Sequence, residues 1–209
     1  MHFHVDGAWG PTLFSDRYRG RLKGIERADS VTIDAHKQLY VPMGVGLVLF
    51  RDPSALGSIE HHAQYIIRQG SKDLGSATLE GSRPGMAMLV HSALKIIGRR
   101  GYGLLIDNGI EMARRFASRV DTLEDFELVS EPELNILTYR WAPAPVQETL
   151  RGADADLCRR INEVLSRITR TVQKTQREHG KAFVSRTRLT PERYGRQLIT
   201  VFRVVLANP

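Results

Sequence analysis

Lys37 ends the segment Asp34-Ala35-His36-Lys37, which directly follows the apolar run Ser30–Ile33. Burial at the end of a strand disfavours the ammonium form of lysine, so the free amine that forms imines becomes available near neutral pH. Asp6 ends an earlier apolar run, Phe3–Asp6, and its carboxylate can pair with a protonated ring nitrogen. The two residues together predict a site for a heterocyclic cofactor that carries a carbonyl group.

Pyridoxal phosphate requires these two groups, because it is held by an imine-forming lysine and activated by an acid that keeps its pyridinium protonated. Lys37 is therefore the candidate catalytic residue, the one that forms the internal aldimine. Asp6 is the candidate for the ring nitrogen, and the protonated ring can then accept the electron pair left when carbon dioxide departs. Taken alone, a lysine at a strand end is usually a surface residue, and such an aspartate is usually a turn or a helix cap.

The segment His4–Pro53 closely resembles the group II pyridoxal-phosphate-dependent amino-acid decarboxylases, which include glutamate, aromatic-amino-acid and cysteine-sulfinate decarboxylases. The run Ala28–Gly44 is most similar to the bacterial pyridoxal-dependent aspartate 1-decarboxylase branch. The resemblance resumes at Thr78–Arg83 and at Val201–Pro209. It implies the C-terminal part of a fold-type I transferase, an α/β fold, with a small α+β domain after it. Relatives are longer, so the chain is expected to be a fragment.

The resemblance also implies roles for four further residues. Ala8 matches the small residue beneath the cofactor ring, and His36 matches the histidine beside the phosphate of the cofactor. Ser82 matches the serine with which relatives reach the phosphate of a neighbouring subunit, which implies a homodimer; its alternative is a simple helix N-cap. Arg203 matches the arginine that binds the substrate carboxylate through a bidentate pair.

Two positions depart from the pattern of the family. Gln38 stands where many relatives have tryptophan, and Gly7 stands where alanine is common. Many relatives also carry a tyrosine in a mobile loop, where it returns a proton to the carbanion. The corresponding residues 66–76 contain no tyrosine, so the proton donor stays unassigned.

The resemblance implies decarboxylation of an amino acid, either aspartate to β-alanine or glutamate to γ-aminobutyrate. Two alternatives remain open from the sequence. One is another fold-type I pyridoxal enzyme, and the other is a catalytically silent fragment or interaction module. The sequence does not decide which amino acid is the substrate, or whether 209 residues bind the cofactor without the remainder of such a protein.

Composition narrows the class of protein. The net charge is +7, and residues 151–209 hold 13 Lys+Arg against 5 Asp+Glu, which leaves +8 in that portion. No nucleic-acid motif accompanies this charge, so a solvated surface is favoured over nucleic-acid binding. No apolar stretch reaches the roughly 20 residues needed to cross a bilayer. A single cysteine, Cys158, suits a reducing compartment, so we expect a cytoplasmic protein, with no metal site.

The patterning predicts two domains, residues 1–100 as the end of the cofactor-binding large domain and residues 101–209 as the small domain. In the first, we expect buried strands, a mobile loop and a helix. These are Phe3–Asp6, Val31–Ile33 and Val45–Phe50 for the strands, 66–76 for the loop, and Pro84 to Ile97 for the helix.

The second domain is expected to begin after a join at Gly98–Gly103. Its predicted elements are a helix over Leu104–Val120, strands at Phe126–Val129 and Ile136–Tyr139, a loop at Ala142–Pro145, and strands at Phe183–Arg188 and Leu198–Leu206. Between them lies a helix with an N-cap at Asp154 or Asp156 and a stop at Gly180. Its predicted apolar stripe comprises Leu157, Ile161, Val164, Leu165, Ile168 and Val172.

Overall fold

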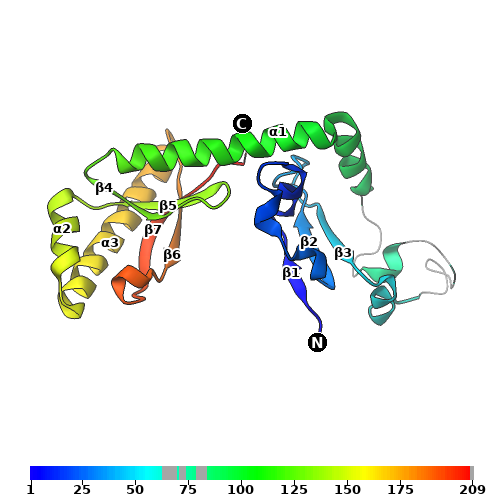
Figure 1. Cartoon of the computed structure of the whole chain (residues 1–209), viewed down its shortest axis with the longest axis horizontal. Helices are drawn as coiled ribbons and strands as arrows, with labels where there is room; N and C mark the ends of the chain where they lie inside the picture. The colour runs from blue at the N-terminus through cyan, green and yellow to red at the C-terminus, as the bar shows by residue number, and fades with distance from the viewer. Residues whose placement is uncertain (63–69, 71–73, 79–83, 208–209) are drawn as a thin grey trace. The chain divides into compact units, whose positions relative to one another are not determined.

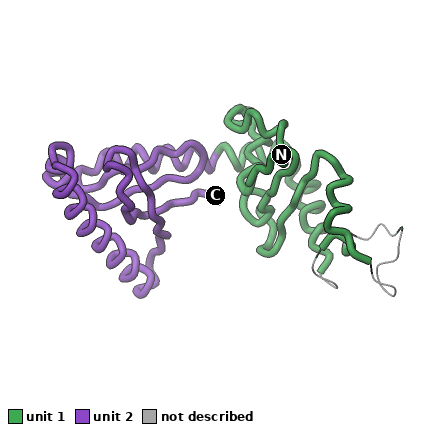
Figure 2. The backbone as a smooth tube through the Cα atoms, turned by 90° about the horizontal axis from the view of Figure 1, so that it is seen from below, with its two compact units in different colours: residues 1–107 green, residues 108–209 purple. Residues whose placement is uncertain are grey.

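The computed structural model describes residues 1–62, 70, 74–78 and 84–207 of the chain. These residues form two compact units, Met1–Asp107 and Asn108–Pro209 (Figure 2). The boundary falls inside one long helix rather than at a loop. The predicted mobile loop at 66–76 lies mostly outside the described residues, which include only Gly70 and the start of a 3₁₀ turn at 74–76.

Unit 1 is built on a three-stranded sheet in the order β1-β2-β3 (Figure 1). The strands are β1 (His4–Asp6), β2 (Ser30–Asp34) and β3 (Gly46–Phe50), which confirms the three strands expected here to within two residues. β1 and β2 are parallel, and β2 and β3 are antiparallel. Short 3₁₀ helices fill the connections: η1 (Gly10–Phe14), η2 (Arg19–Leu22), η3 (Ile25–Arg27), η4 (Pro53–Ser58) and η5 (Leu74–Ala77).

The strand β3 is not buried as the sequence predicted. Val48 is 53% exposed and Leu49 is 52% exposed. Consecutive side chains of a strand point to opposite faces of the sheet. Both faces of β3 are therefore open at this point, within the part of the chain that the structure describes. An apolar run indicates that a strand is compatible with burial, but it does not supply the layers that cover it.

The long helix α1 (Ala87–Asp121) contains a single break, at Gly98, whose φ of 67° and ψ of 168° are not helical. A positive φ is accessible to glycine at little cost, so the two helical segments change direction there. The sequence placed a join over Gly98–Gly103 and a helix start at Leu104. The observed break is shorter than this predicted join, because the helix resumes directly after Gly98. The first segment begins at Ala87, three residues after the expected Pro84.

Unit 2 contains a four-stranded antiparallel sheet in the order β4-β5-β7-β6 (Figure 1). The strands are β4 (Phe126–Ser130), β5 (Ile136–Trp141), β6 (Ser185–Leu189) and β7 (Ile199–Val205), and a 3₁₀ turn, η6 (Glu192–Tyr194), precedes β7. All four expected strands are present within two residues at each end. The ring of Tyr139 lies 5.5 Å from that of Phe116 on α1 and 5.3 Å from that of Phe202 on β7. Aromatic packing thus joins this end of α1 to the sheet.

Helix α3 (Ala155–His179) packs on the sheet, chiefly along β7. Its expected ends are confirmed, because Asp154 Oδ1 accepts a hydrogen bond from Leu157 N at 2.8 Å and Gly180 closes the helix with a φ of 66°. The predicted apolar stripe is only partly correct. Val164 and Val172 are exposed, whereas the buried face consists of Asn162, Leu165, Ser166, Thr169 and Gln173. Polar residues occupy this face because unit 2 supplies hydrogen-bonding partners for it.

The expected loop at Ala142–Pro145 instead leads into a short helix, α2 (Ala144–Gly152). The two prolines that suggested a loop lie at its N-cap and in its first turn, where the missing amide hydrogen costs nothing. Leu150 of α2 packs with Leu165 of α3 and with Ala142 to form a small core. The prolines of this stretch therefore begin a helix rather than exclude one.

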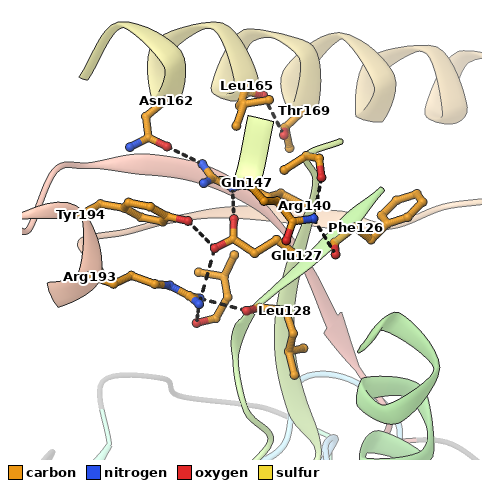
Figure 3. A network of polar contacts seen from close by, with 12 residues as sticks. Phe126, Glu127, Leu128, Arg140, Gln147, Asn162, Leu165, Thr169, Arg193 and Tyr194 are labelled. Atoms are coloured by element: carbon orange, nitrogen blue, oxygen red, sulfur yellow. Dashed lines mark hydrogen bonds and ion pairs between the residues drawn. The ribbon is translucent and has the colours of Figure 1, made fainter. Parts of the chain in front are cut away.

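A buried polar network links β4, β5 and α3 (Figure 3). The Arg140 side chain is fully buried, and its Nε donates to Glu127 Oε2 at 2.6 Å while its Nη1 donates to Asn162 Oδ1 at 2.7 Å. The hydroxyl of Tyr194 donates to the other oxygen of Glu127. A buried charge pair is tolerated only when hydrogen bonds satisfy its remaining atoms, and this network supplies most of them.

Candidate active site

The parallel pair β1 and β2 brings the first two predicted site residues to one edge of the sheet. Asp6, the last residue of β1, lies beside Thr32, and Lys37 follows the end of β2 by three residues. Carboxyl ends of neighbouring parallel strands meet at the same edge, and ligands of α/β proteins commonly bind there. The structure therefore places the ends of the two predicted strands at one edge of the sheet.

Lys37 is partly exposed, and its Nζ lies 2.7 Å from Asp34 Oδ2. The same Nζ lies 5.4 Å from the centre of the Trp9 ring, within cation–π distance. Trp9 belongs to the segment that follows β1, whereas Lys37 belongs to the segment that follows β2. Their contact joins the two segments at the same point. The sequence assigned no role to Asp34 or Trp9, although both stand inside the motifs that drew attention to this region.

Asp6 is exposed, and its Oδ1 accepts a hydrogen bond from the backbone nitrogen of Ala8 at 3.1 Å. This contact turns the chain sharply after β1, as expected for an aspartate that bonds its own backbone two residues on. The turn interpretation of Asp6 is thus correct, and the exposed carboxylate is still available to a ligand. Ala8 is half-buried beside it.

Gly7 explains how this turn fits against β2. A Cβ atom placed at Gly7 would lie 2.8 Å from Val31 Cγ1 and 2.9 Å from the backbone oxygen of Thr32. Both distances are below normal contact, so this backbone approaches β2 more closely than an alanine would allow without a shift. The departure from the alanine of relatives therefore matches a close contact in this chain.

His36 is half-buried, and its Nδ1 atom is buried without a hydrogen-bond partner among the described residues. A buried polar nitrogen left unpaired carries a cost in free energy unless something else satisfies it. Its neighbour Ala35 is fully buried, and Ala35 N donates to Val45 O at 3.1 Å. The segment is thus fixed to β3, while one polar atom of His36 is available for a ligand.

Two buried side chains support the segment that carries Lys37. The hydroxyl of Tyr102 donates to the backbone oxygen of Leu39 at 2.9 Å, and Thr12 Oγ1 donates to Gln38 Oε1 at 3.2 Å. Gln38 is 2% exposed, so the residue that replaces the family's tryptophan is an internal anchor in this chain. Burial, together with the nearby Tyr40, raises the pKa of Tyr102, which keeps its hydroxyl a donor. No sequence pattern indicated Tyr102, because it lies 63 residues from Leu39, on α1.

The structure does not test the roles of the two remaining predicted site residues, Ser82 and Arg203. Ser82 lies outside the described residues. Arg203 lies on β7 of unit 2, beside Thr138 and Ser185, and its guanidinium forms no ion pair with the residues that the structure describes. Its backbone oxygen accepts a hydrogen bond from Ser185 Oγ at 2.6 Å. The role of Arg203 thus stays a prediction.

The sequence model of the family described as "Pyridoxal-dependent decarboxylase conserved domain" matches residues 1–142, which contain the whole Lys37 cluster. The chain belongs to this family. Membership confirms the resemblance and identifies pyridoxal phosphate as the cofactor of the proteins to which the chain is related.

No helix in the described part is long and apolar enough to cross a membrane.

Two relatives of this chain are named for decarboxylation of aspartate. Aspartate 1-decarboxylase of Aliivibrio fischeri is 60% identical over 209 residues, which cover 100% of this chain and 38% of that protein. L-aspartate decarboxylase of Thermococcus kodakarensis is 38% identical over 149 residues, which cover 66% of this chain and 37% of that protein. The chain therefore spans well under half the length of these relatives.

Solved structures agree on the fold. Mouse CSAD in its apo form aligns with a TM-score of 0.79 at 28% identity, covering 100% of this chain and 42% of that one. Oryza sativa TDC with PLP and tryptamine aligns with a TM-score of 0.76, covering 99% of this chain and 40% of that one. The second likeness, at 20% identity, shows the fold alone. The predicted fold-type I class is confirmed.

The residues of unit 1 fit pyridoxal phosphate. Lys37 is accessible to a carbonyl group because its side chain is 31% exposed. The Asp6 carboxylate is exposed at the same sheet edge, and the Nδ1 atom of His36 has no partner among the described residues. An amine, an acid and an unpaired imidazole nitrogen are the groups that this cofactor needs from these positions.

Proposed function

We propose that this chain is the C-terminal part of a pyridoxal-phosphate-dependent amino-acid 1-decarboxylase, and that its substrate is L-aspartate, which gives β-alanine. The observation that carries the proposal is the cluster of Lys37, Asp6 and His36 at one sheet edge, in a chain 60% identical to a named aspartate 1-decarboxylase. L-glutamate, giving γ-aminobutyrate, is the second substrate to test. We assign residues 1–107 to the cofactor-binding domain and residues 108–209 to the small domain, with the division inside α1.

Each residue has a distinct task in this proposal. Bound pyridoxal phosphate supplies an electron-accepting ring for the pair of electrons left when carbon dioxide departs. Lys37 holds the cofactor covalently, and Asp6 keeps a proton on the ring nitrogen. His36 lies beside the cofactor and donates or accepts through Nδ1. Ala8 leaves room beneath the ring because it has no side chain beyond Cβ.

We assign substrate binding to Arg203, through a bidentate pair with the carboxylate that is lost. Holding that carboxylate orients the bond to be broken, which favours loss of carbon dioxide over other reactions. Support comes from the resemblance of Val201–Arg203 to the corresponding segment of relatives. We further propose a cytoplasmic homodimer in which Ser82 reaches the phosphate of the neighbouring subunit. Its support is the same resemblance at Thr78–Arg83, together with the single cysteine of the chain.

The test is to reduce the purified chain with borohydride in the presence of pyridoxal phosphate and to map the labelled peptide. We expect an imine absorbance band and a pyridoxyl label on Lys37, both absent in Lys37→Ala. Lys95→Ala is the matched control, because Lys95 is an exposed lysine of the same unit. A folded sample that carries no specific label would contradict the proposal and favour a catalytically silent chain. A labelled sample is then assayed for carbon dioxide release from aspartate and from glutamate.

A further inference from the structure

Asp34 and Lys37 form an ion pair across the turn that follows β2. Asp34 Oδ2 lies 2.7 Å from Lys37 Nζ, and the two side chains are 26% and 31% exposed. Lys37 N also donates to the backbone oxygen of Asp34 at 3.1 Å. The backbone turn therefore sets the distance between the two side chains.

The surroundings of the pair limit its freedom to separate. Asp34 lies beside Gly46 in the ladder of β2 and β3, and Tyr102 holds the backbone of Leu39 on the far side of Lys37. Trp9 contacts the ammonium group from another segment. Lys174 and Glu178 on α3, in contrast, are 3.8 Å apart and mostly exposed. The pair at Lys37 is closer and less exposed than the Lys174–Glu178 pair, and an exposed pair of that kind contributes little to stability.

This pairing has a chemical consequence for an imine-forming lysine. An ammonium group has no lone pair and cannot attack a carbonyl carbon, so Lys37 must first lose one proton and keep both electrons on nitrogen. The Asp34 carboxylate, 2.7 Å from Nζ, draws the Lys37 side chain toward itself and away from an incoming reagent.

We propose that Asp34 is a positioning residue that restrains Lys37. In the chain without cofactor, Asp34 holds the Lys37 side chain turned toward the Asp34 carboxylate, which slows the reaction of Nζ with carbonyl and acyl reagents. The relevance of this restraint to catalysis rests on the proposed function, in which Lys37 is the lysine that binds the cofactor. The restraint itself is a property of the cofactor-free chain and is measured without pyridoxal phosphate.

The test is competitive labelling of the cofactor-free chain with limiting acetic anhydride, followed by peptide mapping of each lysine. The rate at Lys37 is expressed relative to that at Lys95, an exposed lysine of the same unit. We expect Asp34→Asn to raise this ratio about two- to fivefold, the range for loss of a part-exposed ion pair. Asp34→Glu keeps a carboxylate and is expected to return the ratio toward the wild-type value.

Asp16→Asn is the matched control, since Asp16 is an exposed carboxylate of unit 1 that pairs with Arg19 and Arg99 rather than with a lysine. It removes the same charge and is expected to leave the ratio unchanged. If Asp34→Asn does not fold, the salt dependence of the Lys37 to Lys95 labelling ratio in the wild-type chain provides the test. About 1 M salt shortens the screening length to about 3 Å, so the ratio should rise with salt.

An unchanged or lower ratio in folded Asp34→Asn overturns the restraint, and so does an unchanged ratio in salt if that variant does not fold. The proposed function is judged separately, by the pyridoxyl label after borohydride reduction. A raised acylation ratio without any pyridoxyl label on Lys37 would support the restraint and overturn the cofactor role. A pyridoxyl label with an unchanged ratio would do the reverse.

Discussion

Gly7 is the residue where the turn after β1 passes closest to β2. A Cβ atom there would lie 2.8 Å from Val31 Cγ1 and 2.9 Å from Thr32 O, and the second of these is a backbone atom that yields only with the strand. We expect Gly7→Ala to lower the free energy of unfolding by about 1–3 kcal/mol, the usual cost of overpacking. Urea denaturation followed by circular dichroism measures the change.

Two other glycines provide graded controls for this substitution. A Cβ atom at Gly10 would lie 3.3 Å from the Ile33 side chain, so Gly10→Ala should cost less than Gly7→Ala. Gly20 has no atom within 4 Å of the added Cβ, so Gly20→Ala should change stability by no more than about 0.5 kcal/mol. Equal effects at all three positions would show that the cost is conformational rather than steric.

At this scale the sequence indicated candidate residues more readily than their partners. Lys37, Asp6 and His36 stand out because their motifs are short and follow apolar strands, and their roles stay predictions. The contacts of Lys37 with Asp34 and Trp9 could not, because the direction of a side chain after a strand depends on the turn that follows. The sequence shows Gln38 only as a departure from the tryptophan of many relatives. Its burial and its hydrogen bond with Thr12 become visible only in the folded structure.

At the scale of elements, α1 supports the segment that carries Lys37 through Tyr102. Tyr102→Phe removes the donor to Leu39 O and leaves that buried acceptor unpaired, which should cost about 1–3 kcal/mol. We expect faster hydrogen exchange at the amides of residues 38–41, since these lose their anchor. Tyr194→Phe removes a tyrosine hydroxyl from unit 2 and should leave exchange at these amides unchanged. Unchanged exchange in Tyr102→Phe would show that other contacts hold the segment.

The N-cap of α3 is a second prediction at this scale. Asp154→Ala removes the side-chain acceptor for Leu157 N and should lower the free energy of unfolding by about 1 kcal/mol. Asp154→Asn keeps an acceptor oxygen and should change stability by only a few tenths of a kcal/mol. Urea denaturation of both variants checks the difference. A similar loss in both would indicate that the charge near the helix terminus matters more than the hydrogen bond.

The sequence predicted whether a segment is a helix or a strand better than it predicted which face of that element is buried. The strands and the ends of α3 carry local signals, such as alternating or apolar runs, an aspartate cap and a terminal glycine. α2 was missed because its two prolines are equally compatible with a loop and with a helix N-terminus. The buried face of α3 was misassigned because its Asn162 and Gln173 are polar. These residues are buried only because Arg140 and the backbone of Val184 offer them partners from other elements.

At the scale of the whole molecule, the apolar sequence of β3 predicted that other elements would cover this strand, and the described residues do not cover it. Val48 and Leu49 of β3 are apolar and yet open to solvent on both faces of the sheet. The chain covers 38% of the Aliivibrio fischeri relative. Apolar composition therefore predicted the strand correctly and its environment incorrectly.

The stability of the molecule at high pH should depend on the network around Glu127. Burial, and then the hydrogen bond to the Glu127 carboxylate, raise the pKa of Tyr194 from 10.0 to about 12. A raised pKa means that the folded state retains the Tyr194 proton more strongly than the unfolded state does. Its contribution to stability is therefore complete below about pH 10 and is lost as the pH rises from about 10 to about 12.

The comparison of wild type with Tyr194→Phe isolates this contribution, because other tyrosines and the lysines titrate in the same range in both chains. Tyr194→Phe should be less stable than wild type below pH 10, since it loses the hydrogen bond to Glu127. The difference should shrink between about pH 10 and about pH 12, as the wild type loses what the variant never had. Urea midpoints measured across this range test the prediction. A difference that stays constant would mean that the folded state does not raise the pKa of Tyr194.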